Sequence, residues 1–145
     1  MKITVTQNSS VSETQVHIIC SQMSSELEEI ISNLGLCDHT FAGILNNEIF
    51  FIPMKDILYF ESVDKKTFFY TNESTYESKI RLISIDQNLD NTYFSRISKT
   101  VIANLKKLKS IKPDKSSKLI ATLLNGEKLM VSRKYVMDIK KKLGV

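Results

Sequence analysis

Short β-strand patterns recur about every 8 to 10 residues through the middle of this chain, and this spacing limits its fold more than any other feature. Residues typical of turns stand between them, at Asn46-Asn47, Pro53, Asp64-Lys65-Lys66 and Asn72-Glu73. Strands this short and this close together pair most simply with their neighbours in antiparallel order. The sequence therefore predicts an antiparallel, meander-like sheet with strands at Phe41–Leu45, Glu48–Pro53, Ile57–Ser62, Thr67–Thr71 and Thr75–Ser78.

The second half of the chain continues the β pattern between short helices. Leu82, Ile85 and Leu89 give one apolar face to a helix expected over 80–89, which would cover the sheet. Asn125-Gly126 is the strongest hairpin signal and predicts a type I′ turn. Further strands are expected over 107–112, 119–124 and 128–131, with one helical turn over 105–108 and a last helix over 133–143, between Ser132 as N-cap and Gly144. The predicted fold class is mainly β with a few short helices.

Residues 1–40 are expected to form a small ββα extension ahead of a domain that spans residues 41–145. Lys2–Thr6 and Gln15–Cys20 have strand patterns that would pair as a hairpin. A helix then begins at Ser24 or Ser25 and ends at Gly35, with an apolar face formed by Leu27, Ile30, Ile31 and Leu34. A unit of this size cannot hold a large core. We therefore expect it to pack on the rest of the chain or on another protein, in oligomerisation or partner binding.

Charge is distributed unevenly along the chain, although the net charge is only +4. The residues from Ser95 to Val145 include 14 Lys or Arg against 3 Asp or Glu, whereas the residues before them are net acidic. A basic segment beside an acidic one indicates a face that binds a polyanion. A solvated lysine surface is the alternative, and the contrast between the two segments makes it less favoured.

The stretch Phe94–Leu105 contains the most informative local pattern. Arg96, Ser98 and Thr100 alternate with Ser95, Ile97 and Lys99, as in an extended segment with two faces. Apolar residues follow as an anchor. Two cations and several hydroxyls beside a rigid anchor suit recognition of phosphates and base edges. They do not suit acid–base catalysis, because none of these groups titrates near neutral pH. A strand with a polar face is the simpler alternative.

An enzyme is not expected from this sequence. It contains no P-loop, no dinucleotide-binding glycine motif and no nucleophile elbow. Asp56, Glu61 and Asp64 flank one apolar strand and are interpreted as strand-end and turn carboxylates. Cys20 and Cys37 are expected to be reduced structural thiols, and with His17 and His39 they do not form a zinc spacing. We expect no catalytic residue, metal, cofactor or small-molecule substrate, and a cytoplasmic location, because no signal peptide or membrane span is visible.

Three ordered blocks of the sequence resemble the LytTR DNA-binding domain of bacterial transcription regulators, from about Phe41 to the C-terminus. The blocks are IPMKDILYFESVDKKTFFYT, FSRISKTVIANL and LNGEKLMVSRKYVMDIKKKL. The family often has His where Ile97 or Ser98 stands, and Arg or Asn where Lys99 stands. The resemblance implies a ten-stranded antiparallel multi-sheet β fold whose loops and short helix reach into the major groove of double-stranded DNA with repeated half-sites. It also implies a stand-alone regulator without a receiver domain, a homodimer, and an inhibitory membrane-protein partner.

The resemblance also places the DNA-binding residues in three clusters on one edge of the fold. Thr67 with Lys66, Lys99 and Arg133 match positions that contact bases. Phosphate contacts are implied for Arg96, Ser98, Thr100 and Lys134, and Lys65 belongs to the first cluster. Asn104 has two roles open to it, a buried cap or a DNA contact, and the cap is favoured.

Two alternative functions come from other classes of protein. A nonspecific RNA-binding or ribosome-associated protein would suit the lysine-rich half. However, its aromatic residues would be interleaved with basic ones, and here they lie in the acidic half. A protein–protein interaction module for an acidic partner is the other alternative.

Overall fold

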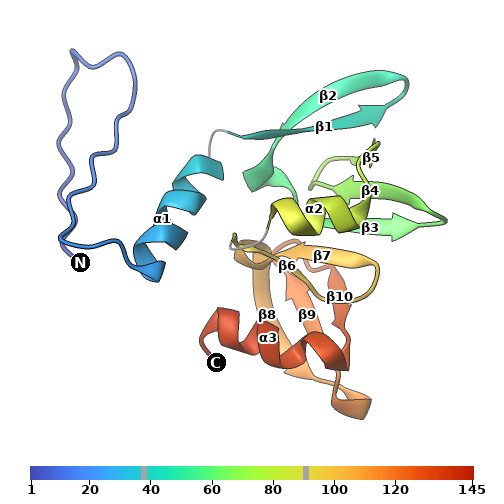
Figure 1. Cartoon of the computed structure of the whole chain (residues 1–145). Helices are drawn as coiled ribbons and strands as arrows, with labels where there is room; N and C mark the ends of the chain where they lie inside the picture. The colour runs from blue at the N-terminus through green and yellow to red at the C-terminus, as the bar shows by residue number, and fades with distance from the viewer. Residues whose placement is uncertain (37–38, 90–91) are drawn as a thin grey trace.

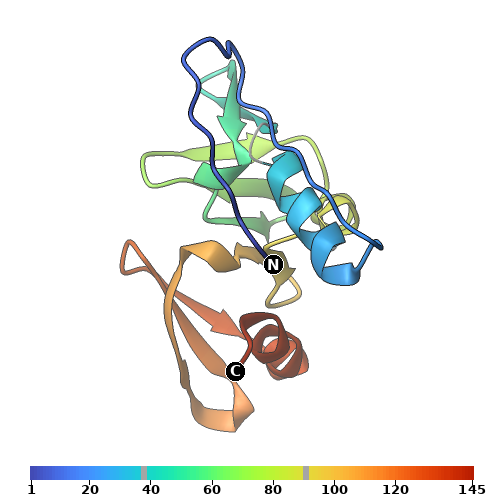
Figure 2. The same cartoon turned by 90° about the vertical axis from the view of Figure 1, so that its left-hand side faces the viewer.

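The computed structural model of the chain describes residues 1–36, 39–89 and 92–145. Within these ranges the chain forms ten β-strands in two antiparallel sheets, together with three α-helices (Figure 1). The three-stranded sheet and the C-terminal helix lie below the seven-stranded sheet in both views (Figures 1 and 2). The predicted fold class, mainly β with short helices and more than one antiparallel sheet, is confirmed.

The seven-stranded sheet has the strand order β2-β1-β5-β4-β3-β7-β6, and the three-stranded sheet has the order β10-β9-β8. The strands are β1 (Thr40–Leu45), β2 (Glu48–Pro53), β3 (Tyr59–Val63), β4 (Lys66–Tyr70), β5 (Thr75–Ser78), β6 (Phe94–Arg96), β7 (Val101–Asn104), β8 (Leu108–Pro113), β9 (Leu119–Leu123) and β10 (Lys128–Val131). The helices are α1 (Ser25–Leu36), α2 (Leu82–Asn88) and α3 (Arg133–Leu143), and short 3-10 turns occupy Met54–Asp56, Leu105–Lys107 and Lys115–Ser117. Every strand predicted from Phe41 onward forms within about two residues of its expected bounds.

Two hairpins turn through pairs of residues in the left-handed region. Asn46 and Asn47 join β1 to β2 with φ of 51° and 63°, and Asp64 and Lys65 join β3 to β4 with φ of 50° and 65°. Positive φ at both central positions is the type I′ geometry, whose twist matches that of the flanking strands. Lysine seldom adopts this conformation, so the surrounding ladder holds Lys65 in it.

The type I′ turn predicted at Asn125-Gly126 is wrong. Only Gly126 of this pair has a positive φ, at 89°. Its N–H donates to the Leu123 carbonyl over 2.9 Å, so the loop has three residues and Gly126 takes the left-handed position. Such a loop is the next most common hairpin connection after the two-residue turns, and it needs glycine at one position only.

The stretch around Arg96 is a hairpin, and the single extended segment predicted for it is wrong. β6 pairs antiparallel with β7, with Phe94 opposite Asn104. Between the strands, the Ser98 hydroxyl accepts the Thr100 N–H over 3.2 Å. Serine and threonine hydroxyls that bond nearby backbone groups compete with a strand ladder. The same hydroxyls that gave the pattern its alternation therefore reverse the chain.

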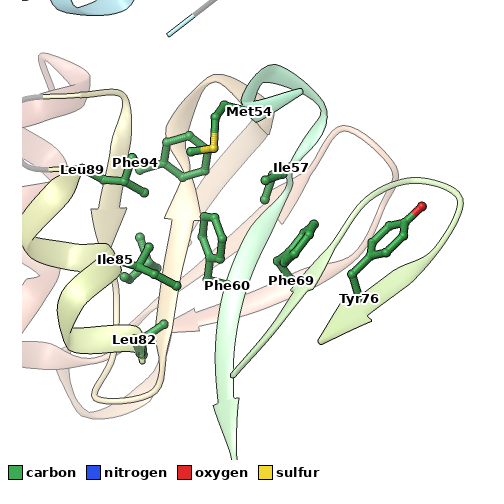
Figure 3. Packing of buried hydrophobic residues seen from close by; sticks show 10 residues of the cluster. Met54, Ile57, Phe60, Phe69, Tyr76, Leu82, Ile85, Leu89 and Phe94 are labelled. Carbon is green, nitrogen blue, oxygen red and sulfur yellow. The ribbon is translucent and has the colours of Figure 1, made fainter. Parts of the chain in front are cut away.

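Strands β3 and β7 bury both of their faces, and each face belongs to a different core. Phe60 and Ile102 enter the core between the seven-stranded sheet and α2, while Tyr59 and Ala103 enter the core between β3, the three-stranded sheet and α3. Figure 3 shows Phe60, Phe69 and Phe94 with Met54, Ile57, Ile85 and Leu89 in the first core. The second core is mainly aliphatic, with Leu58, Ile97, Leu119, Leu123, Val131 and Ile139.

The predicted ββα extension is only partly correct, because α1 forms and the two strands do not. The Ser24 hydroxyl accepts the Leu27 N–H over 3.2 Å, which confirms an N-cap at this serine. Residues 1–24 are exposed throughout and contain no strand. In Figure 1 they form an open loop that stands away from both sheets. An isolated two-stranded hairpin is marginal in water, so a strand pattern without a neighbouring sheet does not form one here.

Candidate nucleic-acid interface

Backbone hydrogen bonds join the three predicted clusters on one edge of the fold. The Ser62 N–H, at the end of β3, donates to the Thr100 carbonyl over 2.8 Å and ties the β3–β4 hairpin to the β6–β7 loop. The Ser132 N–H donates to the Ile97 carbonyl over 2.9 Å and ties this loop to the start of α3. Segments more than 30 residues apart in the sequence therefore form one continuous surface, which we call the recognition edge.

The β3–β4 turn presents lysines at one end of the recognition edge. Lys65 and Lys66 are exposed, and Lys66 forms a loose ion pair with Glu77, with 3.8 Å between Nζ and Oε1. Exposed pairs of this kind contribute little energy, so Lys66 is available to a polyanion. Thr67 is different, because it is only 5% exposed. A buried side chain cannot reach a base edge without moving, so the structure does not support the base contact predicted for Thr67.

The β6–β7 loop is shaped by Arg96. Its Nε lies 2.9 Å from Oδ2 of Asp86 on α2, and its Nη1 donates to the Lys99 carbonyl. The Arg96 side chain is only 19% exposed. Arg96 therefore holds the loop against α2 and shares its charge with a carboxylate, which weakens the case for the predicted phosphate contact. Ser98, Lys99 and Thr100 form the tip, and Lys99 and Thr100 are exposed.

Helix α3 is held in place at both of its ends. Ser132 anchors the first turn through its backbone bond to Ile97, and Lys142 Nζ donates to Ser95 Oγ on β6 over 2.9 Å. Ser132 occupies the N-cap position, as predicted, but its side chain makes no capping hydrogen bond. The Tyr135 N–H donates to the Ser132 carbonyl over 2.9 Å, so the N–H groups of Arg133 and Lys134 are the ones left to solvent or to an anion.

Arg133 and Lys134 extend from this first turn and are exposed. Asp138, the carboxylate that would neutralise Arg133 in a simple surface pair, lies 3.3 Å from Lys142 Nζ instead. Lys134 Nζ lies 5.6 Å from the centre of the Tyr135 ring. The guanidinium of Arg133 therefore forms no ion pair within the described part of the chain.

Arg81 also belongs to the recognition edge, although the sequence did not indicate it. A cavity of about 370 Å³ is lined by four cationic side chains, Lys65, Arg81, Arg96 and Lys99, together with Ser62, Thr67, Leu82 and Ile83. Among these cations, Arg96 alone has an ion-pair partner among the described residues. Arg81 precedes α2 and lies outside the three sequence blocks, so only the packing of α2 on β3 and β7 brings it here.

Asn104 is a buried structural residue. It is 1% exposed, its Nδ2 donates to the Ile57 carbonyl over 2.9 Å, and its Oδ1 accepts the Lys106 N–H over 3.0 Å. The amide therefore caps the 3-10 turn after β7, which confirms the favoured role. The DNA contact also assigned to Asn104 is wrong, because both ends of the amide are used inside the protein.

Two stacked tyrosines lie at the ends of β3 and β4 that are remote from the β3–β4 turn, and the Tyr59 hydroxyl connects the two sheets. The rings of Tyr59 and Tyr70 stack with 4.4 Å between their centres. Tyr59 Oη donates to Glu127 over 2.6 Å, and Tyr70 Oη donates to Glu61 over 2.7 Å. Burial, followed by the bond to Glu61, raises the pKa of Tyr70 to about 12. Burial and the bond to Glu127 raise the pKa of Tyr59 further. The Glu61 carboxylate therefore accepts a hydrogen bond from Tyr70 within the sheet.

The remaining candidate residues do not form a second site. Within the described ranges, no group of three or more His, Cys, Asp or Glu is placed to hold a metal ion. Cys20 is a free, exposed thiol, so it does not pack in a core as a structural residue, and Cys37 lies outside the described residues. None of the described helices combines the length and the apolar character needed to cross a membrane.

Cationic turns and a helix start on a rigid β scaffold are typical of a nucleic-acid-binding domain. Comparison with known families identifies which one. Residues 47–144 match the LytTr DNA-binding domain, and the chain belongs to this family. The resemblance stated from the sequence is confirmed.

Known proteins resemble the chain in structure and in sequence. The solved LytTr DNA-binding domain of a methyl-accepting/DNA response regulator from Bacillus cereus has a TM-score of 0.69 and 28% identity, covering 74% of this chain and 99% of that one. HTH-type transcriptional regulators of Staphylococcus aureus strains NCTC 8325 / PS 47 and MRSA252 are 25% and 24% identical over 147 residues, covering 100% of this chain and 99% of theirs. In the described part of this chain, five strands separate α2 from α3, so these helices do not form a helix-turn-helix.

Proposed function

We propose that this protein is a transcription regulator that binds double-stranded DNA in a sequence-specific manner. The β3–β4 turn, the β6–β7 loop and the start of α3 enter the major groove. The observation that carries this proposal is the pair of backbone hydrogen bonds that join these three segments into the recognition edge. A surface built from bonded segments is ordered before DNA arrives, so binding does not pay the entropy of assembling it.

The exposed cations of the recognition edge have distinct roles in this proposal. Arg133 reads a base, because a guanidinium on an anchored first turn can bond guanine O6 and N7 together. Lys66 and Lys99 reach the groove from the two turns. Lys65, Arg81 and Lys134 hold phosphates, as do the backbone N–H groups of Arg133 and Lys134 at the start of α3. Arg96, Ser98 and Thr100 keep the loop in shape and contribute at most a weakened phosphate contact.

Substitution of Arg133 tests base reading. Arg133→Ala is expected to cost about 1–3 kcal/mol on the cognate site and to relax preference at one base pair. Arg133→Lys keeps the charge but loses the bidentate geometry, so it should recover nonspecific affinity and little discrimination. The measurement is the ratio of cognate to random duplex affinity, with the cognate site selected from a random duplex pool.

The matched control for Arg133 is Arg81→Ala, which removes an exposed arginine from the same edge. It should weaken cognate and random DNA equally and leave the affinity ratio unchanged. If Arg133→Ala also leaves this ratio unchanged while the protein stays folded by circular dichroism, then Arg133 does not read a base. Preference for RNA over duplex DNA in the same titrations would replace the proposal with the RNA-binding alternative.

We further propose that residues 1–40 serve oligomerisation or partner binding and do not touch DNA. Glu26, Glu28 and Glu29 in α1 would repel phosphates. On the apolar face of this helix, Ile31 and Leu34 remain exposed and available to a partner.

The proposed assembly is a cytoplasmic homodimer on repeated half-sites, restrained by a membrane protein. Deleting residues 1–36 should preserve single-site binding and weaken cooperative binding to two sites. Loss of all single-site affinity in a folded truncation would contradict this assignment.

A further inference from the structure

The outer edge of the seven-stranded sheet is apolar and uncovered. β2 pairs with β1 on one side, and no described strand lies on the other side, as Figure 1 shows at the top of the sheet. Phe51 is 70% exposed, Ile49 is 61% exposed and Phe50 is 36% exposed. Natural edge strands are usually short, charged or covered, because an open apolar edge invites pairing with another strand. β2 carries only Glu48 as a charge, so its exposure requires an explanation.

The pairing pattern shows which backbone groups are free along this edge. Ile44 of β1 lies opposite Ile49 of β2, and Ile44 also pairs with Glu77 of β5. The Asn46-Asn47 loop has two residues, so the flanking pair Leu45 and Glu48 bonds mutually and the next pair, Ile44 and Ile49, does not. The backbone groups of Ile44 therefore face β5, and those of Ile49 face outward. The same alternation turns the N–H and C=O of Phe51 outward.

We propose that β2 pairs antiparallel with β2 of a second copy of the chain, around a two-fold axis that passes through Phe50. Ile49 of each copy then lies opposite Phe51 of the other. All outward N–H and C=O groups of these two residues are paired, which gives about four hydrogen bonds between the copies. An interface of this kind is self-complementary, as a two-fold dimer requires.

The side chains fit the same register. Ile49 and Phe51 share the face of β2 that points away from the aromatic core, so each copy places an isoleucine against the phenylalanine of the other. Directly opposite aromatic and β-branched side chains stabilise antiparallel pairs. Phe50 meets its counterpart on the other face, beside Tyr76, whose ring centre lies 5.7 Å away. Four exposed apolar side chains and two partly exposed ones are covered together.

A second copy fits this edge better than the other strand-patterned segment of the chain. Residues 1–24 also carry apolar side chains, but they contain no strand in the structure. Ordering such a segment costs roughly 1–2 kcal/mol per residue in backbone entropy. β2 is already held in its sheet, so two copies pair without this cost. Because the interface is small, the dimer is weak and forms at high micromolar to millimolar concentration.

Cysteine cross-linking tests the register directly. In a chain with Cys20→Ser and Cys37→Ser, Phe50→Cys should form a disulfide-linked dimer on mild oxidation, because opposite residues of a non-bonded pair have Cα atoms about 4.5 Å apart. Glu48→Cys is the matched control on the same strand. In the proposed register its two copies lie about 13 Å apart, too far to bridge. Equal cross-linking of the two variants would overturn the proposal.

The native cysteine distinguishes the occupants of the edge. If residues 1–24 cover β2, the cysteine introduced by Phe50→Cys should form a disulfide with Cys20. Replacing Cys20 should then abolish the cross-link. The proposal expects the Phe50 cross-link to persist with Cys20→Ser. A link that requires Cys20 overturns the pairing of β2 with β2 and assigns the edge to the N-terminal segment.

A second variant measures association without any cross-link. Phe51→Lys should weaken dimerisation at least tenfold in sedimentation equilibrium without DNA, because it replaces the opposite partner of Ile49 with a charge. Leu124→Lys is the matched control, since Leu124 is 61% exposed on the distant β9–β10 loop. The control should dimerise like the natural chain. A chain that remains monomeric at millimolar concentration, or dimers of equal strength in both variants, would refute the proposal.

Discussion

The two cores of this protein differ in composition and in what they support. The core beneath α2 is aromatic, with Phe60, Phe69 and Phe94 at its centre, and its sheet ends in the open edge at β2. The core beneath α3 is aliphatic and is enclosed by the three-stranded sheet. The recognition edge draws on both, because its two turns come from the first sheet and Arg133 comes from α3.

Strands β3 and β7 explain how one surface spans two cores. They are buried on both faces, and the β3–β4 turn and the β6–β7 loop extend directly from them. Turns that leave doubly buried strands are held more rigidly than turns at a sheet margin. The aim of the recognition residues therefore depends on the junction between the cores, and substitutions at the junction should differ from substitutions within one core.

The largest effect is expected at the junction, from Asn104→Ala. The change leaves the Ile57 carbonyl without its partner inside the core and removes the cap of the part-buried Lys106 N–H. The orphaned buried carbonyl costs about 1–3 kcal/mol and the lost cap about 1 kcal/mol, so the free energy of unfolding should fall by roughly 2–4 kcal/mol. Urea denaturation followed by circular dichroism measures it.

Asn125→Ala is the matched control for Asn104. Asn125 also accepts a backbone N–H, from Glu127 over 3.0 Å, but on the exposed surface. Its loss should cost less than about 1 kcal/mol, because water replaces the bond. Equal losses for the two asparagines would mean that burial of the Asn104 amide is not what stabilises the junction.

The next effect is expected within the aromatic core alone, from Gly43→Ala. A β-carbon at Gly43 would overlap the Phe69 ring and lie 2.6 Å from Cβ of Tyr76. Both neighbours are buried, so the strain should lower stability by about 1–3 kcal/mol. The thermal midpoint should fall, whereas the cognate-to-random DNA ratio of the folded protein should stay unchanged. A changed affinity ratio would mean that strain in the aromatic core also alters the recognition edge.

A smaller effect is expected at high pH, where Tyr70 ionises. The pKa of Tyr70 is about 12 in the folded protein and near 10 when unfolded, so the folded state favours the neutral phenol. Its contribution to stability is therefore complete below pH 10 and is lost as the pH rises from 10 towards 12. Urea midpoints across this range should fall more steeply for the natural protein than for Tyr70→Phe. If the urea midpoints of the two proteins fall equally with pH, then folding does not raise the pKa of Tyr70.

The sequence predicted the strands and the family well but not the partners of each residue. Local patterns place Tyr59 and Phe60 in a strand, since alternation and turn residues are local properties. They cannot show that residues 2–6 lack a neighbouring strand, or that Thr67 faces inward. Arg81 escaped notice for the same reason, because it joins the recognition edge only through the packing of α2.

The smallest effect is expected from Arg81→Ala. This variant distinguishes the part of the recognition edge built on the seven-stranded sheet from the part built on α3. Arg81 lines the cationic cavity formed by the first sheet and α2, whereas Arg133 stands on the second core. A phosphate contact adds about −0.9 to the slope of log K against log salt, so about five contacts give a slope near −4.5. Arg81→Ala should make this slope less steep by about one. Lys79→Ala, which removes an exposed cation two residues away and outside the cavity, should leave it unchanged. If both variants shift the slope equally, the cavity contributes only general charge. If only Arg81 does so, the first sheet holds a defined phosphate, and base reading remains with α3.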